Sequence, residues 1–130
     1  SGEEGNYDSD MPEISADGRF VAFRSGASTL VPGDINGWDT FVHDRQTGET
    51  TLVSVSSSGE QANNYSYTNA ISADGRFVTF VSMASNLIAG DINGVEDISM
   101  RQSARRTAWA QKLWRALLPN YLKNCSQTDN

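Results

Sequence analysis

The sequence predicts an all-β protein of two four-stranded blades of the β-propeller type, the second incomplete, followed by a C-terminal amphipathic α-helix. The first observation is an exact repeat: Ile-Ser-Ala-Asp-Gly-Arg-Phe-Val begins at Ile14 and again at Ile71, a spacing of 57 residues. Two further motifs repeat in that register, Gly-Asp-Ile-Asn-Gly from 33 and 90 and Ser-Gly-Glu from 1 and 58. The last observation is that the spacing of apolar residues changes after residue 104, from the period of 2 typical of a strand to the period of 3.6 typical of a helix. A fixed period of this size is typical of stacked or radial repeat architectures.

Composition and charge limit the classes of function. The chain has 130 residues, enough for one domain, and a net charge of −6. Residues 1–100 carry 15 acidic and 4 basic residues, whereas residues 101–130 carry 1 and 6. The acidic body argues against nucleic acid as a partner. No apolar run is long enough to span a membrane, the N-terminus has no signal-peptide pattern, and the single cysteine excludes an internal disulfide bond.

The first unit, residues 1–57, is expected to contain four short strands after a polar loop at 1–11. Alternating or β-branched segments predict these strands at 13–15, 19–25, 40–44 and 50–55. Asp17-Gly18 is a hairpin-turn dipeptide, and Pro32-Gly33 and Asn36-Gly37 mark a long loop. Four short antiparallel strands joined by tight turns make one propeller blade.

The second unit, residues 58–103, repeats this pattern only up to its third strand. Its strands are expected at 68–71, 76–82 and 97–100, and the segment 101–104 resembles the turn at 45–48. The fourth strand is replaced by an amphipathic helix over 104–123, followed by a tail at 124–130. The apolar stripe of this helix contains Ala110, Leu113, Trp114, Leu117, Leu118 and Tyr121.

The Ala-Asp-Gly-Arg-Phe core, with a Thr-Gly turn before the last strand, resembles the TolB-like β-propeller repeat. The long bacterial variety, with an Asp-x-Asn-Gly loop between its second and third strands, is the most similar. The resemblance covers about residues 1–103. It implies an extracytoplasmic, non-catalytic propeller used for binding or scaffolding, although some such repeats gate the active sites of peptidases.

Two loops are the candidate metal sites. Oxygen ligands two residues apart on a turn, with a later carboxylate, suit a hard cation such as calcium. The alternative is that Asn-Gly makes a tight turn and the aspartates accept backbone hydrogen bonds. The candidate ligands are Asp34, Asn36 and Asp39 in the first loop and Asp91, Asn93 and Asp97 in the second.

No residue is predicted to be catalytic. Asp17 and Asp74 recur, but each lies in an Asp-Gly turn, where local hydrogen bonding explains it. His43 is the only histidine, so one chain cannot form a histidine-based metal cluster. No cofactor other than calcium is indicated.

The leading functional prediction is a non-enzymatic binding or scaffold module that recognises a protein or glycan partner. Two units cannot close a propeller, because closed propellers have about four to eight blades. The chain is therefore expected to self-associate, with a trimer giving six blades, or to belong to a larger protein. One alternative is an enzyme or enzyme accessory domain, acting on glycans or associated with a peptidase. Another is attachment to a membrane or a partner through the basic helix, although covering an open strand edge is the favoured role for that helix.

Overall fold

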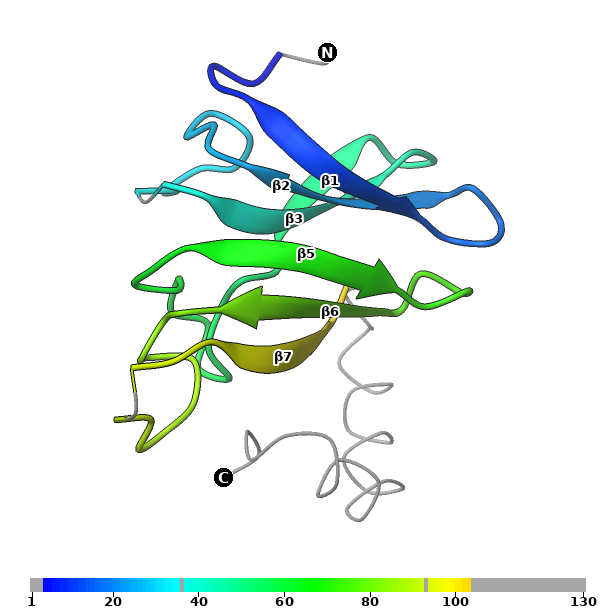
Figure 1. Ribbon diagram of the computed structural model, residues 1–130. Helices are drawn as coiled ribbons and strands as arrows, with labels where there is room; N and C mark the ends of the chain where they lie inside the picture. Colours follow the sequence, from blue (N-terminus) through cyan, green and yellow to red (C-terminus); the bar gives the residue numbers. More distant parts are fainter. Residues whose placement is uncertain (1–3, 36, 93, 104–130) are drawn as a thin grey trace.

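The chain folds into two antiparallel β-sheets that lie one against the other in this computed structural model (Figure 1). The structure describes residues 4–35, 37–92 and 94–103, and within these ranges it contains no helix. The first sheet has the order β1-β2-β3-β4 and the second the order β5-β6-β7. The strands are β1 (Ser9–Ile14), β2 (Phe20–Ser25), β3 (Asp39–Asp44), β4 (Glu49–Leu52), β5 (Ser66–Ile71), β6 (Phe77–Ser82) and β7 (Asp97–Gln102). The helix expected over 104–123 and the tail at 124–130 lie outside the described residues.

Four strands differ clearly from the sequence-based expectation. β4 ends at Leu52 and not at 55, β5 begins at Ser66 and not at 68, and β1 and β7 also differ. β1 begins at Ser9, inside the segment expected to be a loop, because backbone pairing with β2 and not apolar alternation defines it. Its register shifts between Asp10 and Glu13, and such a bulge breaks the period of 2 that marks a strand in a sequence. β7 continues to Gln102, which pairs with Phe77 as Asp44 pairs with Phe20. Residues 101–104 therefore do not correspond to the turn at 45–48.

The two Asp-Gly turns have the same geometry. Ser15 Oγ donates to Asp17 Oδ1 over 2.6 Å, and Asp17 Oδ1 also accepts the N–H of Arg19 at 3.0 Å. The equivalent distances at Asp74 are 2.7 and 3.0 Å. Gly18 has φ of 71° and Gly75 has φ of 70°, so glycine is needed at both positions. The local role predicted for both aspartates is confirmed.

The hydrophobic core lies between the sheets. β5 packs against β1, β2 and β3, so the second sheet covers one face of the first (Figure 1). The core residues come from both sheets and from the segments that follow β4 and β6: Phe20, Ala22, Val42, Val53, Ala62, Val78, Phe80, Ala84 and Leu87. Burial of these side chains provides the main favourable contribution to folding.

The hairpin turns of the two sheets also touch. The N–H of Ala16 donates to the carbonyl oxygen of Ala73 over 2.9 Å. The Phe20 ring packs on the backbone of Gly75, where a Cβ would overlap it. Because residues 16 and 73 are equivalent positions 57 apart, this contact joins the same point of both units.

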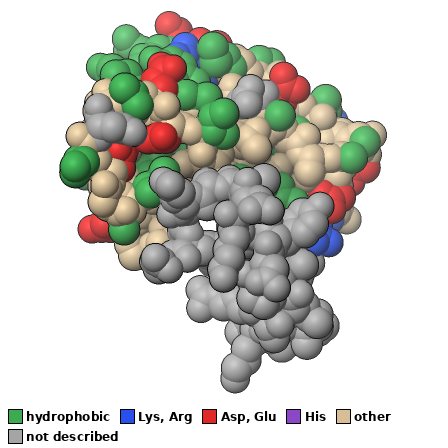
Figure 2. Space-filling model, turned by 60° about the horizontal axis from the view of Figure 1, so that its bottom comes forward, with side chains coloured by type: hydrophobic (Ala, Val, Ile, Leu, Met, Phe, Trp, Pro, Cys, Tyr) green, Lys and Arg blue, Asp and Glu red, His purple; other side chains and the backbone are tan. Residues whose placement is uncertain are grey.

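The surface of the body is acidic. Acidic side chains recur across the face in Figure 2, in keeping with the composition of residues 1–100. Among the residues that the structure describes, none forms a helix long and apolar enough to cross a membrane.

Candidate functional site

The loop between β2 and β3 brings together two of the predicted metal ligands. Gly33, with φ of 82°, lets the chain turn just before Asp34. Asp39 is the first residue of β3 and is 1% exposed, while Asp34 is 8% exposed. The third predicted ligand of this loop, Asn36, lies outside the described residues.

Gln61 joins the two carboxylates. Its Nε2 donates to Asp34 Oδ1 at 2.7 Å and to Asp39 Oδ2 at 2.9 Å. Its Oε1 accepts the N–H of Ile35 at 3.3 Å, which fixes the orientation of the amide. An isolated antiparallel β-bridge between Gln61 and Val55 holds the backbone of Gln61 in this place. The sequence analysis missed this residue, although it directly follows the repeated Ser-Gly-Glu motif.

Asp39 is the most constrained carboxylate of this group. Burial raises its pKa, hydrogen bonds from Ser54 and Gln61 oppose that rise, and the charge of Asp34 adds to it. Ser54 Oγ donates to Asp39 Oδ1 at 2.7 Å and accepts the N–H of Thr40 at 3.1 Å. A cation beside Asp39 would offset this cost of burying its charge.

The donor set suits calcium in kind but not in number. Asp34 and Asp39 supply carboxylate oxygens that converge on one point, as calcium prefers. Calcium takes about six to eight oxygen ligands, and here an amide N–H group faces both carboxylates. Within the described ranges, no group of three or more His, Cys, Asp or Glu side chains could hold a metal ion.

The second loop is arranged differently. The N–H of Asp91 donates to the carbonyl oxygen of Ile88 at 3.3 Å, and Asp97 begins β7 opposite Ser82. Both aspartates are half-buried, and Asn93 is outside the described residues. In the first loop, by contrast, Asp34 and Asp39 are both buried. The two predicted loops therefore differ in the burial of their aspartates.

An arginine held between aromatic rings lies on β2. The Arg24 guanidinium is 4.3 Å from the centre of the Trp38 ring and 4.9 Å from that of Tyr67. Its Nε and Nη2 donate to the two carboxylate oxygens of Asp10 at 2.7 and 2.5 Å. These bonds lower the pKa of Asp10 and raise that of Arg24. The cluster links the sheets, because Arg24 belongs to β2 and Tyr67 to β5.

Exposed tyrosines flank this cluster. Tyr7 meets the Trp38 ring edge to face, with 5.8 Å between centres, and is itself 62% exposed. Tyr65, 49% exposed, lies beside Gly37, where a Cβ would come within 3.1 Å of its ring. We call Tyr7, Arg24, Trp38, Tyr65 and Tyr67 the aromatic cluster. The sequence analysis did not group these residues, because they lie on four separate segments.

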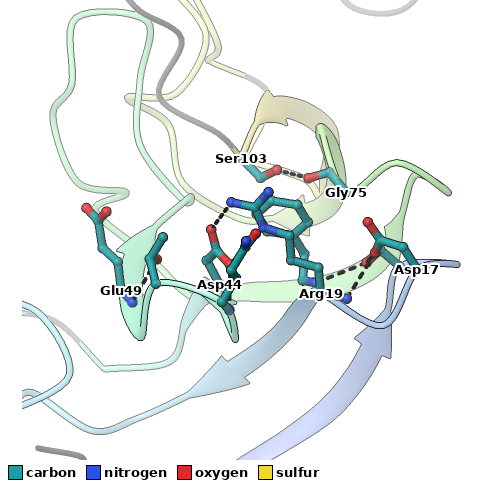
Figure 3. Close-up of polar contacts among 10 residues, drawn as sticks. Asp17, Arg19, Asp44, Glu49, Gly75 and Ser103 are labelled. Atoms are coloured by element: carbon teal, nitrogen blue, oxygen red, sulfur yellow. Dashed lines mark hydrogen bonds and ion pairs between the residues drawn. The ribbon is translucent and has the colours of Figure 1, made fainter.

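A small pocket lies at the other end of the first sheet (Figure 3). It encloses about 210 Å³ and contains the Arg19–Asp44 ion pair, whose two hydrogen bonds measure 2.9 and 2.7 Å. The Arg19 guanidinium holds the pKa of Asp44 well below its usual range. Ser103, which directly follows β7, also lines the pocket, and its hydroxyl donates to the carbonyl oxygen of Gly75. The pocket thus lies where the two sheets meet.

The remaining polar candidates have structural partners. His43 Nδ1 lies 3.0 Å from Thr50 Oγ1 on the neighbouring strand. Asp17 and Asp74 are bonded within their turns, and these bonds lower the pKa of both.

Comparison of the chain with protein-family models, with curated proteins and with solved structures found no match.

Proposed function

We propose that the protein is a non-enzymatic binding or scaffold module built from two propeller-type repeats, of the TolB-like kind that its sequence resembles. The agreement between units extends to side-chain contacts and supports this proposal. Ser9 and Ser25 are joined by a hydroxyl hydrogen bond of 2.9 Å, and Ser66 and Ser82 by one of 3.0 Å at the equivalent positions. Face-to-face packing of neighbouring units is what a propeller requires.

The aromatic cluster is the observation that carries the binding role. Tyr, Trp and Arg are the residues that most often dominate binding energy at interfaces. Here Arg24 is already fixed by Asp10 and two rings, so little side-chain freedom is lost when a partner binds. Tyr7 and Tyr65 present exposed ring surface beside it. Such a surface suits a protein side chain or the apolar face of a sugar ring.

The experiment measures binding and turnover on the same panel of glycans and peptides. The full chain should bind a member of the panel without hydrolysing it. Tyr7→Ala and Tyr65→Ala should weaken that binding at least tenfold, as for truncated hot-spot residues. Ile92→Ala is the matched control, since Ile92 is an exposed apolar residue that is not part of the aromatic cluster, with 96% of its surface exposed. Hydrolysis of any panel member would favour the enzyme alternative, and binding insensitive to both tyrosines would reject this surface.

We further propose that calcium stabilises the first loop through Asp34 and Asp39. The burial of two neighbouring carboxylates supports this proposal, because Asp34 is 8% exposed, Asp39 is 1% exposed, and the charge of Asp34 raises the pKa of Asp39. A bound ion would offset the raised pKa of the buried Asp39 and would stabilise the fold by mass action.

The melting temperature, measured with millimolar calcium and with a chelator, tests this second proposal. Calcium should raise it, and Asp39→Asn should abolish most of the rise. Asp97→Asn is the control, because Asp97 occupies the same place at the start of β7 but is only half-buried. Equal melting curves with calcium and chelator would leave hydrogen bonding as the only role of the loop.

A further inference from the structure

One face of each sheet forms the contact inside the chain. The first sheet contributes Phe20, Ala22 and Val42, and the second contributes Val78 and Phe80. All five are at most 8% exposed. We call the opposite face of each sheet, which points away from the other sheet, its outer face. Because the sequence repeats every 57 residues, the outer face of each sheet carries the positions that are equivalent to the buried face of the other sheet.

The outer face of the first sheet matches the buried face of the second. The residues 57 positions before Val78 and Phe80 are Val21 and Phe23, which are only half-buried. Ile71 packs against the core, whereas its counterpart Ile14 is 57% exposed. The same apolar positions are thus buried or packed against the core in the second unit, and half-buried or exposed in the first.

The outer face of the second sheet matches the buried face of the first. Phe77 and Thr79 follow Phe20 and Ala22 by 57 residues, and both are half-buried. Met100 pairs with Thr79 as Val42 pairs with Ala22, so it completes the same face.

The backbone hydrogen bond between the two hairpin turns could be repeated between copies, because each turn retains the group that the other turn uses. Inside the chain the N–H of Ala16 donates to the carbonyl oxygen of Ala73 at 2.9 Å. Both alanines are exposed. If another unit followed the second sheet in the same way, the N–H of Ala73 would donate to the Ala16 carbonyl oxygen of that unit.

We propose that the outer face of the second sheet binds the outer face of the first sheet of another copy of this chain, head to tail. The inference rests on the repeat architecture of the proposed function, and names a second copy as the partner. A contact between two different faces is heterologous, so it forms a ring if the rotation closes and an open chain if it does not. The two faces to be joined already meet once inside each chain.

One position weakens the contact between copies relative to the contact within the chain. Arg24 of the first sheet reaches the Tyr67 ring of the second at 4.9 Å. The counterparts of these residues are Val81 and Asp10, which cannot form a cation–π contact. Association between copies should therefore depend on protein concentration over the micromolar range.

Sedimentation velocity of the full chain tests the proposal. The mass should rise above 14.2 kDa as the concentration increases. Ile14→Glu should disable one face and Thr79→Glu the other, so each variant should remain a monomer. Met100→Glu provides a second variant on the face of Thr79, and circular dichroism verifies that each variant folds. Gln46→Glu, in the turn between β3 and β4, should associate like the original chain, because Gln46 is exposed and lies outside both faces.

Mixing the two variants distinguishes a head-to-tail contact from a symmetric one. Each variant keeps the face that the other lacks, so an equimolar mixture should form a heterodimer of twice the chain mass and nothing larger. Self-association of Thr79→Glu alone would indicate a symmetric contact through the first sheet and would overturn the proposal. A chain that stays monomeric throughout would overturn it as well. Binding to the glycan and peptide panel is measured separately, so a monomer that still binds would contradict this inference and not the proposed function.

Discussion

Gly18 and Gly75 occupy the same place in the two hairpin turns, with the same positive φ, but have different neighbours. A Cβ at Gly75 would overlap the Phe20 ring, whereas a Cβ at Gly18 would meet only Arg45 Nη1 at 3.8 Å. Backbone strain from alanine, roughly 1–2 kcal/mol, should therefore be common to both sites.

Gly75→Ala should consequently be more destabilising than Gly18→Ala. The additional loss should be about 1–3 kcal/mol, the usual cost of overpacking a core. The free energies of unfolding of both variants, from urea titrations, provide the measurement. Equal losses would show that the turn of the second unit does not pack on Phe20.

The ion pair of Asp44 with Arg19 should make the stability of the protein depend on pH. Its pKa in the folded chain is lowered, first by the hydrogen bonds from Arg19, so its contribution to stability is present above the unfolded pKa of about 4. That contribution is lost as the pH falls through the folded value. The melting temperature should decrease on acidification from about pH 5 to about pH 2, and less steeply for Asp44→Asn.

Arg19→Met removes the same ion pair from its other side and serves as the matched variant. It should flatten the pH profile as Asp44→Asn does, and the double variant should add little to either. A profile unchanged in both variants would show that the pair does not contribute to acid sensitivity.

Residues whose hydrogen-bond partners are close in the sequence could be predicted, whereas residues whose partners are far away in the sequence could not. The Asp-Gly dipeptides were enough to predict the roles of Asp17 and Asp74, because their partners lie within two residues. The meeting of Asp34 and Asp39 also followed from spacing. Gln61 could not be found in this way, because it reaches the loop from 22 residues beyond Asp39 through the path of the backbone.

Strand ends are organised by buried serines. Ser82 is 2% exposed, and its hydroxyl accepts the N–H of Ala84 at 3.1 Å and donates to the carbonyl oxygen of Tyr65 at 3.1 Å. The Ser66 hydroxyl donates to Ser82 Oγ at 3.0 Å. Ser25, at the equivalent place on β2, makes the corresponding bonds to Asp8, Ala27 and Ser9.

Ser25→Ala and Ser82→Ala should each lower the free energy of unfolding by about 1–3 kcal/mol, since each leaves buried polar groups without a partner. Ser57→Ala is the control, because Ser57 is exposed. Chemical denaturation of the three variants provides the comparison. A loss confined to one of the two buried sites would contradict the structural equivalence of the units.

Strand positions were predictable where apolar residues alternate, and less so where they do not. β2, β3 and β6 follow their predicted ranges closely. Buried and less buried positions alternate in β2 and β6, and the apolar Phe41 and Val42 are buried at the centre of β3. β1 is mostly exposed and bulged, so no period of 2 marked its start at Ser9. The end of β7 depends on its register with β6, and its own composition does not reveal it.

For the whole molecule, the repeat determines how the sheets pack. Two copies of one unit present two different faces to each other, and Phe80 of the second sheet lies fully buried between them. The 57-residue spacing was enough to predict two similar units, but not which copy of each position would be buried. That distinction depends on the order of the units, since only the face between them is covered within one chain.

Variants of Phe80 and of its counterpart Phe23 allow the stability of the chain and its proposed self-association to be measured independently. Phe80→Ala should cost about 3–5 kcal/mol, because it leaves a cavity at the centre of the core. This is a large part of the 5–15 kcal/mol that typically stabilises a domain. Phe23 is half-buried and stacks on Phe41 with 5.7 Å between ring centres, so Phe23→Ala should cost less. Urea titrations at low concentration, where copies do not associate, should give that order, and sedimentation should show that Phe23→Ala impairs self-association more than it impairs folding. Equal losses of folding stability would mean that the outer face of the first sheet is already part of the core of a single chain, and would leave it no role in binding a second copy.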